Sequence, residues 1–139
     1  MRTLDRIQRL RDHDKRLARL DLAKAQSAHT SQEQRLREVG DRIDEARKDV
    51  SEVDPAELAQ YHAFRLRMEM LERRERAFLA ETERQVEKRR DEVSVKARES
   101  EVVRLMREAR GEEEALELRR SEEREMDEIR RDLWLRNAA

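Results

Sequence analysis

The only proline of this chain lies between two long tracts that otherwise have the composition of helices. Proline disfavours the α conformation in the residue before it, and it is well tolerated as the first residue of a helix. Asp54 precedes Pro55 and can cap a new helix, with Glu57 at the answering position of a capping box. The sequence therefore predicts a helix break at this point.

A break between two long helices predicts an antiparallel hairpin. Val53 and Leu58 occupy the two positions of a hydrophobic staple, which fixes the direction in which the chain enters the second helix. We predict an all-α fold, an antiparallel two-helix coiled-coil hairpin with a longer second helix. The expected bounds are a first helix over about residues 3–50, a turn over about 51–54 and a second helix over about 55–135, in a single hairpin of residues 1–139.

Composition excludes most enzymes. Charged residues make up 48% of the 139 residues, aromatic residues make up 3%, and there are two glycines, so a compact core with tight turns is not expected. Basic and acidic residues balance at 33 against 34, which gives no indication of a nucleic-acid partner. There is no cysteine, no stretch apolar enough to cross a bilayer, and no signal-peptide pattern at the start.

No arrangement of residues predicts chemistry. The sequence has no glycine-rich phosphate loop and no nucleophile with a base in a plausible fold, so we expect no enzymatic activity and no cofactor. His13, His29 and His62 are too far apart to share a metal on one helix face, and we expect each to be solvated or at the edge of the seam.

Apolar residues in the first tract repeat in steps of three and four, which is typical of a coiled-coil seam. They are Leu36, Val39, Ile43, Ala46, Val50 and Val53. The same register extends backwards through Gln32, His29, Ala25 and Leu22. Nearer the start a different register fits Ile7, Leu10 and Leu17, and we expect the supercoil to unwind around residues 14–29.

The second tract has a similar seam, strongest near the turn. Its first members are Tyr61, Phe64, Met68, Leu71 and Phe78, with Glu75 interrupting at a seam position. After Leu79 the apolar stripe shifts to Val86, Val93 and Ala97, and we expect it to return with Val103 and Met106. A pair of helices cannot bury every face of such large residues, so part of the patch near the turn should remain available to a partner.

The two ends of the chain carry opposite charge. The first 20 residues hold seven bases against three acids, and residues 112–128 hold nine acids against three arginines. In a hairpin we expect these segments to be near neighbours, with Gly111 a weak point where the first helix runs out. Trp134, between two leucines, is either a frayed terminal cluster or an anchor for a partner.

Two short elements resemble the FliJ family of flagellar export proteins. One is Tyr61-His62-Ala63-Phe64, just after the turn, and the other is the segment 124–129, Arg-Glu-Met-Asp-Glu-Ile, late in the second helix. The resemblance extends to the length of the chain, the hairpin layout and the longer second arm. The YscO-like stalk proteins of injectisomes share this architecture and are the nearest alternative.

The resemblance implies a stalk for protein export. FliJ-type proteins insert into the ring of the hexameric export ATPase (FliI-like), promote its assembly, and bind the export gate protein (FlhA-like). They also contact export chaperones. It further implies a cytoplasmic location, peripheral to the inner-membrane export apparatus. The rivals from other classes are a scaffolding coiled coil that dimerises through its long arm, and a chaperone-like adaptor without an ATPase partner.

The resemblance also suggests which residues serve each partner. The residues that match the family's gate contacts are Val39, Tyr61, Phe64, Met68, Leu71 and Glu75, with looser matches at Arg35, Arg42 and Ala46. The end that carries both termini is expected to enter the ATPase ring, with contacts at Arg124, Met126, Asp127, Glu128 and Ile129. Glu75 and Arg42 are charged where the family pattern has histidine or an aromatic residue.

Overall fold

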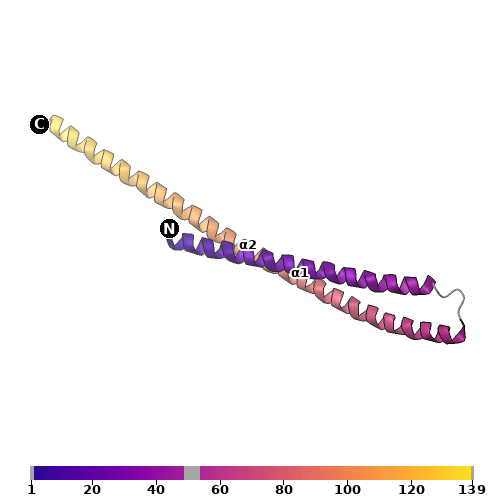
Figure 1. Cartoon of the computed structure of the whole chain (residues 1–139). Coiled ribbons are helices and arrows are strands. Elements are labelled where there is room, and N and C mark those ends of the chain that lie inside the picture. Colours follow the sequence, from indigo (N-terminus) through magenta and orange to yellow (C-terminus); the bar gives the residue numbers. More distant parts are fainter. Residues whose placement is uncertain (1, 49–53, 139) are drawn as a thin grey trace. The chain divides into compact units, whose positions relative to one another are not determined.

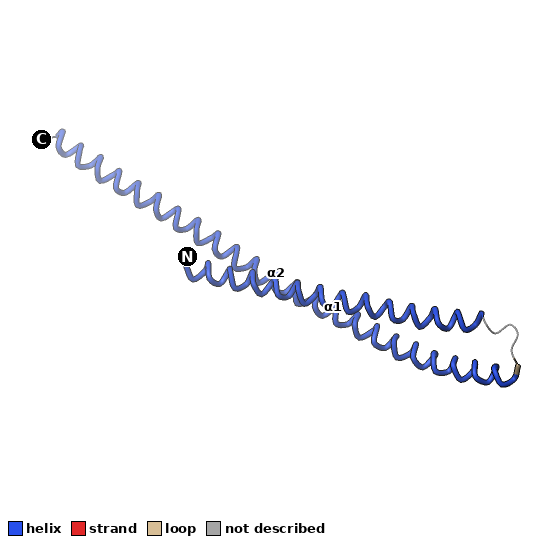
Figure 2. Tube along the Cα trace, in the orientation of Figure 1, coloured by secondary structure: helices blue, strands red, loops and turns tan. Residues whose placement is uncertain are grey.

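Two long helices form the part of the chain that the structure describes. The computed structural model describes residues 2–48 and 54–138, in which helix α1 is Arg2–Lys48 and helix α2 is Pro55–Ala138 (Figure 1). These residues contain no strand, which confirms the all-α prediction and the longer second helix (Figure 2). Neither helix is long and apolar enough to cross a membrane, within those residues.

The start of α2 has the predicted cap. Asp54 lies outside the helix, and its Oδ1 accepts a hydrogen bond of 2.9 Å from the backbone N–H of Glu57. The backbone oxygen of Asp54 accepts a second bond, also of 2.9 Å, from Leu58 N–H. Both bonds satisfy amide groups that the first turn of a helix leaves unpaired. Val50, Val53 and the predicted turn lie outside the described residues, apart from Asp54.

The chain consists of two compact units. The hairpin unit is Arg16–Val95, and the terminal unit combines Met1–Lys15 with Lys96–Ala139. In the hairpin unit, α1 and α2 pack side by side in opposite directions. Cross-helix contacts join Asp21 to Arg89, His29 to Thr82 and Gln32 to Glu75, so residue numbers rise on one helix as they fall on the other. This order confirms the antiparallel hairpin.

The terminal unit has the same antiparallel order but a polar interface. Arg11 Nη1 lies 2.9 Å from Glu99 Oε2, and Arg107 Nε lies 2.8 Å from Asp5 Oδ1. Asp5 therefore faces Arg107 and not the acidic segment 112–128, whose residues are all exposed. The expectation that the acidic segment and the basic start are neighbours is wrong. The start of α1 lies beside the part of α2 around Arg107, and the acidic segment begins only after that point.

The seam of α1 keeps one register over its whole length. Residues at least partly buried follow steps of four and three from Leu4 to Ala46, through Gln8, Arg11, Lys15, Ala18, Leu22, Ala25, His29, Gln32, Leu36, Val39 and Ile43. The predicted second register is wrong, because Ile7, Leu10 and Leu17 are exposed. Polar side chains occupy the seam near the start, and cross-helix hydrogen bonds satisfy several of them.

The seam of α2 shifts register once. Phe78 is exposed and Leu79 takes its place, so the step after Glu75 is four residues where three is expected. Such an insertion unwinds a coiled coil locally. Val86 is buried in the same register as Leu79, so the shift lies before Leu79 and not after it as predicted. Val103 is buried as well. Met106 is exposed, which corrects the prediction that it belongs to the seam.

Candidate functional site

The predicted gate residues line the seam of the hairpin unit. Val39 is buried, with 6% of its surface exposed, and the α2 residues of the set are half-buried: Tyr61, Phe64, Met68, Leu71 and Glu75. The structure thus brings all six predicted residues to one interface between α1 and α2. They hold the two helices together, and the exposed part of each α2 side chain is what a partner could reach.

Glu75, the predicted interruption of the seam, has a partner on α1. Gln32 is buried, with 6% of its surface exposed, and its Nε2 donates to the carboxylate of Glu75. The same group donates to the backbone oxygen of Glu75 at 3.0 Å. A polar pair at a seam position fixes the register of a coiled coil, because every other alignment leaves these groups unpaired.

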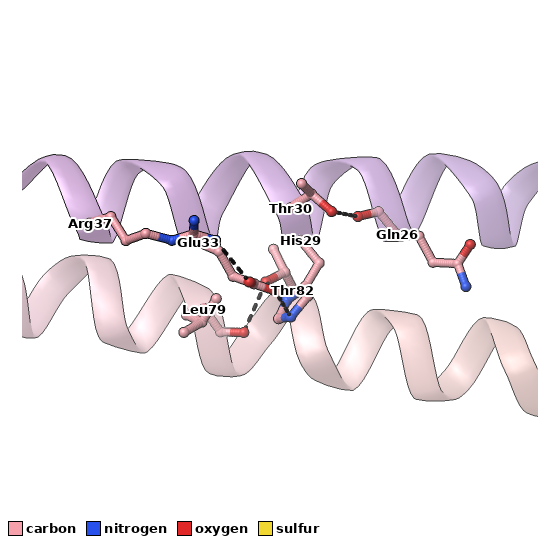
Figure 3. Close-up of polar contacts among 7 residues, drawn as sticks. All are labelled: Gln26, His29, Thr30, Glu33, Arg37, Leu79 and Thr82. Carbon is pink, nitrogen blue, oxygen red and sulfur yellow. Dashed lines mark hydrogen bonds and ion pairs between the residues drawn. The ribbon is translucent and has the colours of Figure 1, made fainter.

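A second polar contact crosses the seam one turn away (Figure 3). His29 Nδ1 lies 2.9 Å from Thr82 Oγ1, and Thr82 Oγ1 donates to the backbone oxygen of Leu79 at 2.9 Å. His29 Nε2 lies 2.8 Å from Glu33 Oε1. His29 thus links Thr82 of α2 to Glu33 of its own helix.

A groove opens beside the predicted gate residues, where α1 has a glycine. It has a volume of about 350 Å³, and α1 contributes Leu36 and Gly40 while α2 contributes Glu72, Arg76 and Leu79. No atom lies within 4 Å of where a Cβ on Gly40 would be. The sequence-based prediction missed this groove. Its signal is Gly40, which has no side chain to fill the surface and which lowers helix stability relative to alanine.

Large apolar side chains also point away from the seam near the turn. Leu66 and Met70 on α2 are exposed to 63% and 70%, more than any residue of the predicted gate set. Phe78 is exposed, and the Arg74 guanidinium lies over its ring, 5.5 Å from the centroid. Arg65 bonds to Glu69, and this bond, together with Tyr61, raises the pKa of the arginine. The sequence analysis did not name Leu66 and Met70, and it placed Phe78 in the seam, which is wrong.

The predicted ring residues lie near the C-terminal end of α2. We call residues 112–138 of α2 the C-terminal tail; all of its described side chains are exposed. Within it Arg124 Nε bonds to the backbone oxygen of Arg120 at 3.2 Å, and Asp127 lies 3.9 Å from Arg130. The predicted set of Arg124, Met126, Asp127, Glu128 and Ile129 is therefore accessible throughout. Trp134 is also exposed.

Potential metal ligands do not cluster. Over residues 2–48 and 54–138, no group of three or more His, Cys, Asp or Glu side chains is placed to hold a metal ion. His13 and His62 are exposed, and the His62 ring lies 5.9 Å from the Tyr61 ring, centroid to centroid.

Comparison with known proteins gives one match. The family model described as the flagellar FliJ protein matches residues 1–139, which is the whole chain. No curated protein and no solved structure matches the chain significantly.

Proposed function

Because this chain belongs to the FliJ family, and is therefore a component of flagellar type III protein export, we propose that it acts as the stalk of the export ATPase. The family is a component of the export apparatus and not a known enzyme. In the proposal the chain inserts into the ring of a hexameric FliI-like ATPase, promotes its assembly, and links it to a FlhA-like gate. It does so from the cytoplasm, at the periphery of the inner-membrane export apparatus.

The observation that best supports this proposal is the exposed C-terminal tail. A stalk inside a ring needs a slender helix whose surface makes repeated weak contacts, and tight apolar docking on one subunit would stop its movement. The tail is a helix with no neighbour among the described residues, and it is rich in charge. We assign the ring contact to Arg124, Met126, Asp127, Glu128 and Ile129.

We assign the gate contact to the predicted set in the hairpin unit. Its α2 members are half-buried, and the groove at Gly40 lies beside them. A partner side chain that enters this groove would contact both helices at once. Export chaperones are further expected partners. We also propose that residues 1–139 act as one hairpin with its turn at about 51–54.

Titration of the export ATPase with this protein tests the ring contact. At an ATPase concentration where the ring is mostly dissociated, we expect activity to rise as this protein is added, and the protein alone to hydrolyse no ATP. Removal of residues 112–139 should abolish the rise and leave gate binding intact. Activity that does not change across the titration would contradict the proposal.

Two phenylalanines provide a matched test of the gate contact. Phe64 is half-buried at the seam, and Phe78 is exposed on another face of α2. We expect Phe64→Ala to weaken gate binding while ATPase stimulation persists, and Phe78→Ala to change neither. Circular dichroism must accompany both, because truncating a partly buried phenylalanine costs stability. If Phe64→Ala keeps its melting temperature and binds the gate normally, the assignment is wrong.

A further inference from the structure

Near the turn, helix α2 has a second apolar stripe on the side opposite the seam. Leu66 and Met70 each lie two residues from the seam residue Met68, which places them about 160° from it around the helix. All residues of the stripe are exposed: Ala59, Ala63, Leu66, Met70 and Ala77. We call this side of α2, over residues 56–78, the outward face. Large apolar side chains that do not help to hold the helices together indicate a surface that another molecule covers.

Arginines border this stripe on both edges. Arg73, seven residues after Leu66, lies on one edge, and Arg67 and Arg74, also seven residues apart, lie on the other. All three are exposed, and none has a carboxylate within ion-pair distance in the described part of the chain. Arg67 and Arg74 have no acidic residue three or four positions away, where a helix would pair it with them. The outward face therefore carries positive charge that its surroundings do not balance.

The carboxylates nearest to the outward face have partners of their own. Glu69 lies just beyond the edge with Arg73, and it pairs with Arg65 at 3.3 Å. Glu81 follows the far end of the face and lies 2.9 Å from Arg84. The other acids of residues 56–78 are on the half of the helix that carries the seam: Glu57, Glu72 and Glu75.

Phe78 adds an aromatic side chain at the far end of the outward face. It is exposed, and the Arg74 guanidinium lies over its ring, 5.5 Å from the centroid. A guanidinium stacked on a ring still presents its N–H groups at the edge, where they can bind a phosphate or a carboxylate. Apolar and cationic groups thus stand side by side along the face.

This arrangement fits the surface of an anionic lipid bilayer. A helix that lies in a membrane interface places its apolar residues at the boundary of the acyl chains, while bordering arginines extend to the headgroups. The stripe from Ala59 to Ala77 is about 27 Å long at 1.5 Å per residue. Anionic lipids supply phosphates along the whole of both edges, whereas a protein partner would need acids placed along both.

We propose that this chain binds anionic lipid surfaces through the outward face, with residues 56–78 of α2 lying in the membrane plane. An anionic membrane is chosen over an acidic protein partly because the proposed function, on which this choice rests, puts the chain at an inner membrane. The gate contact is assigned to the seam side of the same helix, so the two contacts use different surfaces.

Flotation of the full chain with lipid vesicles tests the proposal without any export protein. We expect the chain to float with vesicles of phosphatidylglycerol and phosphatidylcholine in equal parts, and not with phosphatidylcholine alone. Added salt should weaken binding, because it screens exposed charges. Arg67→Glu together with Arg74→Glu should lower the affinity for the mixed vesicles at least about tenfold. The matched control is Arg9→Glu with Arg16→Glu, two exposed arginines of α1 with the same spacing, and it should bind normally.

Tryptophan fluorescence identifies the part of the chain that meets the lipid. Trp134 is the only tryptophan and is exposed in the C-terminal tail, so mixed vesicles should leave its emission unchanged. In a Trp134→Phe chain, Met70→Trp should give emission that moves to shorter wavelengths on binding. Val102→Trp in the same background, at an exposed residue of the terminal unit, should not.

All of these substitutions are at exposed positions, and unchanged melting temperatures confirm that the fold persists. No flotation, equal flotation with both kinds of vesicle, or equal loss in the two double variants overturns the proposal. A shift in Trp134 emission without one in the Met70→Trp chain does so as well. If the chain does not float but the Arg67 and Arg74 variant loses gate binding, the face serves an acidic protein instead. Stimulation of the ATPase is measured separately, so either proposal can fail while the other stands.

Discussion

The two units place their apolar side chains differently, although the same two helices build both. In the hairpin unit Val39 and Val86 are buried in the seam, with large α2 residues half-buried beside them. In the terminal unit Gln8 and Arg11 take seam positions, and apolar side chains such as Leu10, Val102 and Met106 are exposed. The first unit uses its apolar surface to hold the helices together. The second leaves most of that surface available to other molecules.

This difference separates stability from recognition along the chain. Folded proteins are stable by only about 5–15 kcal/mol. Two helices without a deep core bury little apolar surface, so we expect this chain to lie near the lower limit. Apolar residues that lie outside the seam do not help to hold the helices together, so the unit that has them outside is expected to be less stable. The hairpin unit should then be the main source of stability, and substitutions at equivalent positions of the two units should have unequal effects.

The largest contrast is expected from an acidic substitution at an apolar residue in each unit. Val39→Asp puts a carboxylate without a partner at a position with 6% exposure, which should lower the free energy of unfolding by about 3–5 kcal/mol. Leu10→Asp, at a residue 58% exposed, should change it by no more than about 0.5 kcal/mol. Urea denaturation, followed by circular dichroism at low protein concentration, measures both.

Equal destabilisation by the two substitutions would show that Leu10 belongs to the core and would remove the contrast between the units. The concentration matters because self-association would add stability to the unchanged chain by mass action.

The next effect concerns the polar pair in the hairpin unit. Gln32→Ala leaves the Glu75 carboxylate without its donor, and we expect a loss of about 1–3 kcal/mol in the free energy of unfolding. Gln85→Ala is the control, since Gln85 bonds to Glu81 on the exposed side of α2 and should contribute little. If Gln32→Ala costs no more than Gln85→Ala, the pair does not set the register.

The fold followed from the sequence because its strongest signals are local. Pro55 and Asp54 fix the start of α2 through covalent geometry and a cap, which operate whatever the rest of the chain does. The register of α1 from Leu22 to Ala46 followed from spacing alone. The family followed from two short elements, and the match to the whole chain confirms it.

The terminal unit was harder to predict because its seam is polar. Apolar spacing selects the face with Ile7, Leu10 and Leu17, and the helix instead buries the face with Gln8 and Arg11. Continuity of the helical register outweighs local apolar content, because a change of face would require unwinding. Which polar groups meet, such as Asp12 and Ser100, depends on the pairing of helices far apart in sequence.

A smaller effect is expected at the start of α2, where the hairpin unit depends on a cap. Asp54→Ala removes the acceptor for Glu57 N–H and should cost about 0.5–2 kcal/mol. Asp91→Ala is a suitable comparison, because Asp91 is exposed within the helix, where alanine is the better helix former. Thermal melting of each variant, followed by circular dichroism, measures the two changes in stability. If removal of Asp54 costs no more than removal of Asp91, the start of α2 is fixed by packing.

The smallest effect is expected from substitutions of the two glycines. Comparing them tests whether the hairpin unit is the main source of stability. Gly40→Ala adds a methyl group where no atom lies within 4 Å, and it should raise the free energy of unfolding by about 0.5–1 kcal/mol. Gly111→Ala lies next to the tail, beyond most of the packing, so it should slow amide exchange only in neighbouring residues. Hydrogen exchange by mass spectrometry resolves the two. A global gain from Gly111→Ala would mean that the tail folds cooperatively with the rest, and the division between a stable hairpin unit and an open terminal unit would fail.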